Sequence, residues 1–202
     1  NMYTNCHTYY SLRYGTFPVE SLCELAKEHK VKRVALTDIN NTSACLNFIK
    51  MSPEYGIQPV VGIDFRNGAQ QQYVGLARNN AGFRELNEHL SEHLHAEREF
   101  AAEAPSLPNC YIIYPLEQLM GSKRTEFREN EFIGVSVESL RKLRFSPYLR
   151  FRNKLVLLQT VSFRNKRDFN AHRLLRCIGN NTLLSKLPES EQGKLSDCMR
   201  PP

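Results

Sequence analysis

The chain has 202 residues, 41% hydrophobic and 24% charged, proportions that are ordinary for a globular protein with a sizeable core. Its longest apolar runs, at 59–63 and 155–158, are too short to cross a bilayer, and its start lacks the pattern of a signal peptide. The six cysteines stand singly, which argues against a zinc ribbon and against a disulfide framework. We therefore expect reduced thiols in a cytoplasmic protein.

Short apolar runs alternate with amphipathic helical patterns, as is typical of repeated βα units. Strands are predicted at residues 3–6, 33–37, 59–65, 73–77, 110–114, 131–137 and 154–160. Helices are predicted to begin at Pro18, among residues 40–42, at Asn80, at Pro115 and at Asn165. The last of them has an apolar stripe, predicted to face the core, of Phe169, Leu174, Leu175 and Ile178. About seven such strands indicate a closed or nearly closed α/β barrel, with an open doubly wound sheet as the alternative.

The chain reads as a single domain with a polar end. Beyond Pro188 the sequence turns polar and finishes in two prolines. We therefore place one domain at residues 1–187 and a linker or terminal segment at 188–202. No G-x-G-x-x-G or G-K-[ST] sequence follows a predicted strand, so the dinucleotide-binding and P-loop classes lack their phosphate-binding loop.

Functional residues of βα barrels lie just after the carboxyl ends of the strands. Three potential metal ligands stand at such positions: His7, Asp38 and Asp64. A hydrolytic site with two or three metals needs more imidazoles and carboxylates than these. The other positions at this rim carry poor ligands or none, namely Asn5, Ile39, Gln72, Thr160 and Ser162.

Each of the three ligands also has a structural interpretation, which we favour over residual binding of one ion. Asp38 can cap the helix that follows it, because a carboxylate accepts hydrogen bonds from free backbone N–H groups. His7 can be a hydrogen-bonded histidine at the rim, and Asp64 can pair with Arg66.

Five segments of the chain resemble known sequence motifs and occur in the same order as those motifs. Residues 5–15 resemble an H-x-H motif with a serine–leucine segment, 35–41 resemble A-L-T-D-H-x-N, and 55–65 resemble G-I-x-P-I-x-G-x-E. Residues 75–86 resemble L-L-A-x-N-x-x-G-Y-x-N-L, and 171–178 resemble A-H-x-x-L-x-x-I. Together they resemble the N-terminal PHP (polymerase-and-histidinol-phosphatase) domain of bacterial DNA polymerase III alpha subunits.

The resemblance implies a distorted (βα)7-type PHP barrel with a degenerate metal site. It is strong over residues 3–95, returns over about 155–187 and is weak between. His7 and Asp38 keep family ligands, and Asp64 replaces a glutamate. The positions where the resemblance implies a lost ligand are Asn5, Tyr14, Ile39, Gln72, Thr160 and Ser162.

In intact family members this site resembles that of a metal-dependent phosphoesterase. In some polymerases it resembles the site of a proofreading 3′–5′ exonuclease. The losses here imply that this domain is not catalytic by itself and serves as a structural or partner-docking scaffold. The resemblance implies template-directed DNA synthesis (DNA-directed DNA polymerase, a nucleotidyltransferase) by the full-length bacterial protein. An active PHP phosphoesterase or exonuclease, and a non-catalytic stand-alone binding module, remain the alternatives.

The same resemblance implies the cofactors and partners. We expect no cofactor in this domain beyond a weakly held divalent metal, and Mg²⁺ in the full-length polymerase. The expected partners are the polymerase core of the same chain, an exonuclease subunit or other replisome proteins, and DNA for the full-length protein, with no membrane.

The 27 basic and 21 acidic residues give a net charge of +6, and the basic excess lies late in the chain. Such clustering permits contact with DNA or an acidic partner, and a solvated basic face is an equal alternative. The residues concerned are Arg141, Lys142, Arg144, Arg150, Arg152, Lys154, Arg164, Lys166 and Arg167.

Residues 89–93 fit the H-x-x-E-H pattern of a zinc-protease class. His89 and His93 lie one helical turn apart, which suits one metal. The apolar stripe of Phe83, Leu86, Leu90 and Leu94 lies partly on other positions, so we expect both histidines to point toward solvent or the helix flank. No third ligand motif follows, which argues against a protease and leaves adventitious zinc or nickel binding as the alternative.

Overall fold

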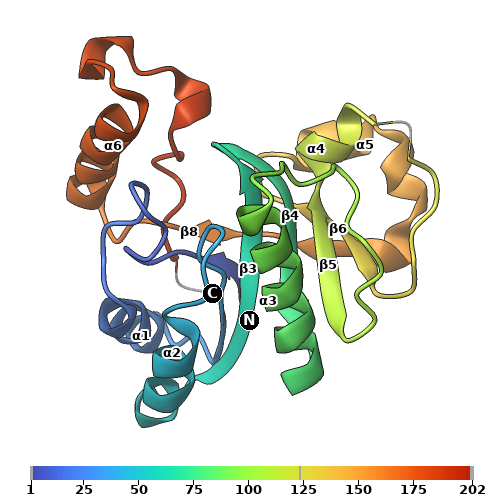
Figure 1. Ribbon diagram of the computed structural model, residues 1–202, viewed down its shortest axis with the longest axis horizontal. Helices are drawn as coiled ribbons and strands as arrows, with labels where there is room; N and C mark the ends of the chain where they lie inside the picture. Colours follow the sequence, from blue (N-terminus) through green and yellow to red (C-terminus); the bar gives the residue numbers. More distant parts are fainter. Residues whose placement is uncertain (1, 123, 201–202) are drawn as a thin grey trace.

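The computed structural model describes residues 2–122 and 124–200, which form one eight-stranded sheet flanked by helices (Figure 1). The strands are β1 Met2–Cys6, β2 Arg33–Leu36, β3 Gln58–Asn67, β4 Gln70–Ala77, β5 Cys110–Pro115, β6 Glu131–Val135, β7 Leu155–Leu157 and β8 Thr160–Val161. The α-helices are α1 Val19–Glu28, α2 Cys45–Met51, α3 Asn80–His95, α4 Leu116–Met120, α5 Leu140–Arg144 and α6 Lys166–Asn180. None of the helices described is long and apolar enough to span a membrane.

The sheet is curled, with the strand order β7-β6-β5-β4-β3-β2-β1-β8. Its two edge strands, β7 and β8, are separated in sequence only by Leu158 and Gln159, so the edges have to lie near each other. The hydroxyl of Thr4 on β1 donates to the Leu157 carbonyl of β7 at 3.1 Å. This arrangement confirms the predicted distorted α/β barrel, and it divides the single strand predicted at 154–160 into two.

Strands β3 and β4 form an antiparallel hairpin rather than a βα unit. Only Gly68 and Ala69 separate them, too few residues for a helical crossover. Gly68 has φ +58°, a conformation that glycine adopts without steric cost. Because β4 runs against its neighbours, its first residues lie beside the last residues of β3, at the end of the sheet where β1 and β2 also finish.

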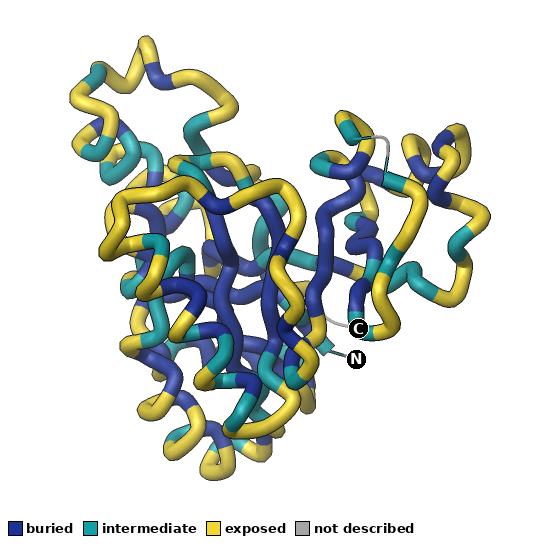
Figure 2. The backbone as a smooth tube through the Cα atoms, turned by 45° about the vertical axis from the view of Figure 1, so that its right-hand side comes forward, coloured by how far each residue is buried: buried dark blue, intermediate teal, exposed yellow. Residues whose placement is uncertain are grey.

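The core lies on both faces of the curled sheet. One cluster packs α1 and α2 against the first strands, with Leu22 and Phe48 fully buried. A second, which includes Leu86, packs α3 and α4 against β3 to β6. Alternate strand residues point the opposite way and form a third cluster, which includes Val74 and Ile113. Figure 2 shows buried strands surrounded by exposed loops and helix surfaces.

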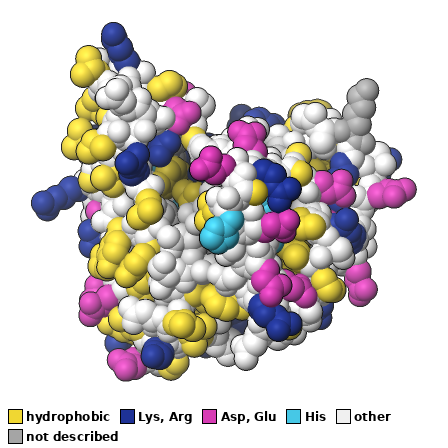
Figure 3. Space-filling model, viewed as in Figure 1, with side chains coloured by type: hydrophobic (Ala, Val, Ile, Leu, Met, Phe, Trp, Pro, Cys, Tyr) yellow, Lys and Arg dark blue, Asp and Glu magenta, His cyan; other side chains and the backbone are white. Residues whose placement is uncertain are grey.

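Helix α6 packs on the domain through only part of its predicted apolar stripe. Asn165 caps the helix by accepting from the backbone N–H groups of Arg167 and Asp168. Leu174 and Ile178, predicted to face the core, are 55% and 69% exposed. Hydrophobic side chains accordingly gather on the surface over α6, at the upper left of Figure 3.

The segment predicted as a linker at 188–202 packs on the domain over its described part, up to Arg200. The backbone N–H of Ser162 donates to the Asp197 carbonyl at 2.9 Å, and a bridge joins Phe163 and Cys198. The Tyr3 hydroxyl bonds to both the backbone N–H and the carbonyl of Arg200. This segment therefore covers the β1–β8 end of the sheet.

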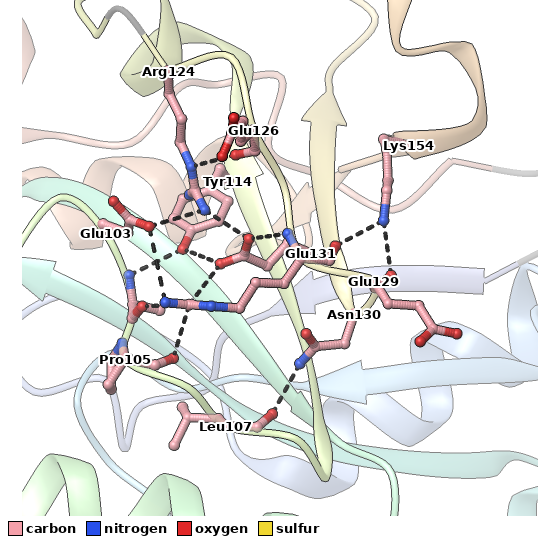
Figure 4. A network of polar contacts seen from close by, with 12 residues as sticks. Glu103, Pro105, Leu107, Tyr114, Arg124, Glu126, Glu129, Asn130, Glu131 and Lys154 are labelled. Atoms are coloured by element: carbon pink, nitrogen blue, oxygen red, sulfur yellow. Dashed lines mark hydrogen bonds and ion pairs between the residues drawn. The ribbon is translucent and has the colours of Figure 1, made fainter.

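A buried carboxylate organises the loops beside β5 and β6 (Figure 4). Glu131 is 0% exposed, and its two oxygens pair with Arg124 at 2.6 Å and Arg128 at 3.1 Å. The Tyr114 hydroxyl donates to the same carboxylate at 2.9 Å. Burial alone would raise the pKa of Glu131, but the hydrogen bond from Arg124 and its other donors lower it.

We expect Glu131→Ala to lower the free energy of unfolding by about 3 kcal/mol, because it removes the buried carboxylate beside Arg124 and leaves only the exposed Glu103, 3.2 Å away, as an ionic partner. Urea denaturation at neutral pH measures this loss. Glu129→Ala is the matched control, since Glu129 is exposed and contacts Lys154 through its backbone carbonyl, which the substitution keeps. Equal stability of the two variants would contradict the structural role of Glu131.

Candidate functional site

The three predicted ligands converge at the end of the sheet where β1 and β2 finish. His7 Nε2 lies 2.8 Å from Asp64 Oδ2, and the backbone N–H of Asp64 donates to the Asp38 carbonyl at 3.3 Å. All three residues are at most 1% exposed. Parallel pairing of β1 with β2 and of β2 with β3 brings these positions together.

Asp64 is the centre of the site because its carboxylate accepts four hydrogen bonds. Arg66 donates to Oδ2 twice, from Nε at 3.0 Å and from Nη2 at 2.7 Å. His7 shares that oxygen, and Gln71 Nε2 donates to Oδ1 at 3.0 Å. Burial would raise the pKa of Asp64, but the Arg66 guanidinium and the His7 bond outweigh it and hold this pKa below its usual range. The carboxylate is therefore ionised and neutralised by a cation of the chain itself.

The Arg66 backbone is fixed by Asn40. The Asn40 Oδ1 accepts from the Arg66 N–H at 3.0 Å, and Asn40 Nδ2 donates to the Arg66 carbonyl at 2.8 Å. Asn40 has φ +47°, a left-handed conformation that asparagine adopts more readily than most residues. The guanidinium also lies over the Tyr14 ring, 5.1 Å from its centroid. Arg66 is thus held from both ends and only 8% exposed.

Both ring nitrogens of His7 have partners. Nε2 faces the ionised Asp64 and carries the proton of that bond, while Nδ1 lies 2.8 Å from Ser162 Oγ. The backbone N–H of His7 donates to the Val161 carbonyl at 2.8 Å. His7 therefore joins β1 to β8 and β3, and neither nitrogen offers a free lone pair.

Asp38 holds the loop that follows β1. Its Oδ1 accepts from the Thr8 backbone N–H at 2.6 Å and from the Ser11 hydroxyl at 2.8 Å, and its Oδ2 accepts from the Thr8 hydroxyl at 2.8 Å. Helix α2 is preceded by Ala44 and has no side-chain cap, so the predicted capping role of Asp38 is wrong. Burial raises the pKa of Asp38, opposed by these three hydrogen bonds.

Two positions where the resemblance implied lost ligands bond to each other. Asn5 and Thr160 are paired in register on β1 and β8, and Asn5 Nδ2 donates to Thr160 Oγ1 at 3.0 Å. The Thr37 hydroxyl donates to Asn5 Oδ1 at 2.8 Å. A chain of neutral hydrogen bonds therefore links the ends of β2, β1 and β8 at positions where the resemblance implied lost ligands.

Tyr14 and Ile39 complete the surroundings of the site. The buried Tyr14 ring packs edge-on against His7, with centroids 5.7 Å apart. Ile39 donates its backbone N–H to Ser11 Oγ at 2.9 Å and forms a backbone bridge with Asp64. Neither side chain can coordinate a metal as a carboxylate or a neutral imidazole does.

Gln71 contacts Asp64, whereas Gln72, the neighbouring rim position where the resemblance implies a lost ligand, bonds elsewhere. A register shift between Phe65 and Arg66 interrupts the β3–β4 ladder at this point. Gln72 Nε2 instead donates to the Gln70 carbonyl at 3.3 Å. The bulge changes which glutamine reaches the site, and an apolar pattern alone does not reveal such a bulge.

A cavity of about 260 Å³ adjoins the site. Tyr14, Arg66 and Gln71 line it on one side. Lys194 and Asp197, from the segment predicted as a linker, line it as well. The sequence did not indicate these two residues, because the polar composition of 188–202 carries no signal of packing.

The residues present do not fit the multi-metal centre that the family resemblance implies. Within residues 2–122 and 124–200, no group of three or more His, Cys, Asp or Glu side chains is placed to hold a metal ion. Both carboxylate oxygens of Asp64 accept hydrogen bonds from protein donors, and Arg66 puts a permanent positive charge 2.7 Å from Oδ2. A divalent cation at this carboxylate would have to displace the guanidinium.

The two histidines of the H-x-x-E-H pattern are engaged by protein groups, while Glu92 is exposed. His89 is 9% exposed, although both histidines were predicted to point toward solvent or the helix flank, and its Nε2 bonds to the Tyr73 hydroxyl at 2.7 Å. His93 Nδ1 bonds to the His89 carbonyl at 2.9 Å, and its ring stacks on Phe100. Burial and the nearby His93 lower the pKa of His89 to about 4.

The predicted basic contact residues fall into two separate groups. Arg141, Lys142 and Arg144 belong to α5, and Arg150 and Arg152 follow it. The second group, at the start of α6, consists of Arg164, Lys166 and Arg167. Helices α5 and α6 lie on opposite sides of the sheet in Figure 1.

A family model described as "PHP domain" matches residues 4–121, more than half of the chain, and the chain therefore belongs to the PHP domain family. Relatives named "DNA polymerase III subunit alpha" match as well. That of Ureaplasma parvum serovar 3 is 30% identical over 82 residues, 41% of this chain and 8% of the relative. That of Streptococcus pyogenes serotype M1 is 23% identical over 198 residues, 96% of this chain. The chain spans only 18% of the length of this streptococcal relative.

His172 joins three parts of the domain near the site. Its Nδ1 donates to the Tyr14 carbonyl at 2.7 Å, and its Nε2 accepts from the Gly193 backbone N–H at 2.8 Å. These two bonds require the neutral ring with the proton on Nδ1. Burial lowers the pKa of His172 to about 4.

We predict that stability falls with acid because His172 must be neutral in the folded state. A histidine with a lowered pKa contributes its full stability above the ordinary value of about 6.5 and loses it as pH falls toward about 4. The free energy of unfolding should drop by up to about 3 kcal/mol over this window. Urea denaturation from pH 7.5 to 4.5 measures it.

His172→Asn provides the comparison, because the other titrating groups stay in place. Its stability curve should be flatter than that of the wild type between pH 6.5 and 4.5. Parallel curves for the two proteins would show that His172 does not carry this dependence.

Proposed function

We propose that the chain is the N-terminal PHP domain of a longer DNA polymerase III alpha subunit and acts there as a scaffold that needs no metal. The single observation that carries the proposal is the Arg66 guanidinium bound to Asp64 at the centre of the site. The match to streptococcal alpha subunits over 96% of this chain supports the placement in such a protein.

Repulsion between Arg66 and a metal ion supports the scaffold role. A divalent cation placed 4 Å from the Arg66 guanidinium would be repelled by roughly 8 kcal/mol at an effective dielectric constant of 20. This corresponds to roughly six orders of magnitude in affinity. Hydrolysis by metal-bound water also needs an open coordination position, and His7 and Asp64 use their acceptor atoms on protein donors.

The proposed role is to support the polymerase core of the same chain and to dock replisome proteins such as an exonuclease subunit, in the bacterial cytoplasm. Template-directed DNA synthesis with Mg²⁺ would belong to the full-length protein. The basic group at the start of α6, formed by Arg164, Lys166 and Arg167, is a surface that this proposal offers to such partners.

We predict that replacing Arg66 changes the response of the chain to metal. Thermal unfolding of the wild type should shift by less than about 1 °C when MnCl₂ is added, because nothing binds in the site. Arg66→Met should melt lower, since it leaves Asp64 buried without its cation, and should regain several degrees with manganese. Differential scanning fluorimetry measures both.

Two further variants keep this test decisive. Arg66→Lys retains the positive charge and should remain indifferent to manganese, although less stable than the wild type. Arg84→Met removes an exposed arginine of α3 and should match the wild type throughout. A wild-type chain that is stabilised by manganese and cleaves a 3′-labelled oligonucleotide, with both effects lost in Asp64→Asn, would overturn the proposal in favour of an active phosphoesterase.

A further inference from the structure

The net charge of the protein is concentrated in one short stretch. Residues 140–154, called here the basic segment, contain six arginines or lysines and no acidic residue. Since the whole chain has 27 basic and 21 acidic residues, the remainder has 21 of each and is neutral. The basic segment therefore carries a net charge equal to that of the entire chain.

The basic segment is fixed in place by residues that alternate with its cations. Leu143 and Tyr148 are buried, and the Tyr148 hydroxyl donates to the Leu119 carbonyl at 2.9 Å. Ser146 accepts from the Tyr148 backbone N–H and donates to the Leu143 carbonyl. These anchors hold the backbone, so the side chains between them are presented on a defined surface.

The cations of this segment are not neutralised by the domain. In the described part of the chain, none of the six forms an ion pair with a carboxylate. Lys154 bonds to the backbone carbonyls of Arg128 and Glu129, and Arg150 lies over the Phe151 ring. Some arginines elsewhere are neutralised by the domain: Arg124 binds Glu131 and Arg176 binds Glu191.

An aromatic ring stands in the middle of these charges. Phe145, directly after α5, is 86% exposed, more than any other large hydrophobic residue among those described. It follows Arg144 in sequence, and Arg141 and Lys142 lie within the preceding turn. An exposed ring among unpaired cations is the combination with which proteins bind single strands of nucleic acid, by stacking on a base and pairing with phosphates.

We propose that the basic segment is a binding surface for single-stranded DNA, with Phe145 stacking on an unpaired base and Arg141, Lys142 and Arg144 contacting phosphates. A duplex fits less well, because its bases are stacked on each other and closed to Phe145. An acidic protein fits less well too, because the centre of a stable protein interface is depleted of charge, whereas here six cations are interspersed with the exposed apolar residues Leu140, Phe145 and Leu149. The inference goes beyond the metal-free scaffold and stands or fails independently of it, because Arg66 takes no part in it.

Fluorescence anisotropy with a labelled oligo-dT of about 20 nucleotides tests the proposal on the full 202-residue chain. Arg141→Gln/Lys142→Gln/Arg144→Gln should weaken binding at least tenfold at low salt. It should also reduce the slope of log K against log salt by about 2, since each single-strand phosphate contact contributes about 0.7. Phe145→Ala should weaken binding about tenfold without changing that slope, and Phe145→Leu should weaken it similarly, because leucine cannot stack.

Matched controls separate this surface from charge in general. Lys27→Gln/Lys32→Gln/Lys50→Gln removes three exposed cations from the α1–α2 side and should leave binding within about twofold of the wild type. Equal losses in both triple variants would overturn the proposal. It would also be overturned by equal affinity for a duplex of the same length, or by poly-glutamate binding as tightly as oligo-dT with no effect of Phe145, which would indicate an acidic protein partner.

Discussion

The ion pair between Asp64 and Arg66 is the interaction on which the rest of the site depends. The two residues lie two positions apart on β3, so the carboxylate and its counter-ion come from one strand. A buried charge that loses its partner costs about 3–5 kcal/mol, so neither residue can be removed alone at little cost. Because the cation is part of the chain, the centre of the site is complete once the sheet has folded.

The residues around this ion pair that stand at positions of implied ligands extend the hydrogen bonding across the sheet. Asn5 and Thr160, at positions where the resemblance implied ligands, are joined by a hydrogen bond between their side chains. The Ser162 hydroxyl bonds to the second ring nitrogen of His7, Nδ1. Hydrogen bonds between side chains thus link the ends of β2, β1 and β8 at this end of the sheet. The result is a polar network that is fully used by the protein, which is the condition for a buried network to stabilise a fold.

The sequence predicted the element order, the barrel class and the convergence of His7, Asp38 and Asp64, because apolar periodicity and the positions after strands are local signals. It could not predict that Gln71 replaces Gln72 at the site, since a β-bulge leaves no apolar pattern. It also missed that Lys194 and Asp197 line the cavity, because their segment is polar and held by backbone hydrogen bonds. The exposed part of the α6 stripe shows the same limit, since periodicity indicates an apolar face and does not say what covers it.

The central claim is that a guanidinium, and not a metal ion, occupies the middle of this PHP site. The most direct test is a crystal structure of the chain from crystals soaked in MnCl₂, with diffraction data that record the anomalous signal of manganese. The account predicts continuous density for Arg66 between Asp64 and Tyr14, with no anomalous peak beside His7 or Asp64. Arg66 turned out toward solvent, with manganese bound to Asp64 in its place, would contradict it.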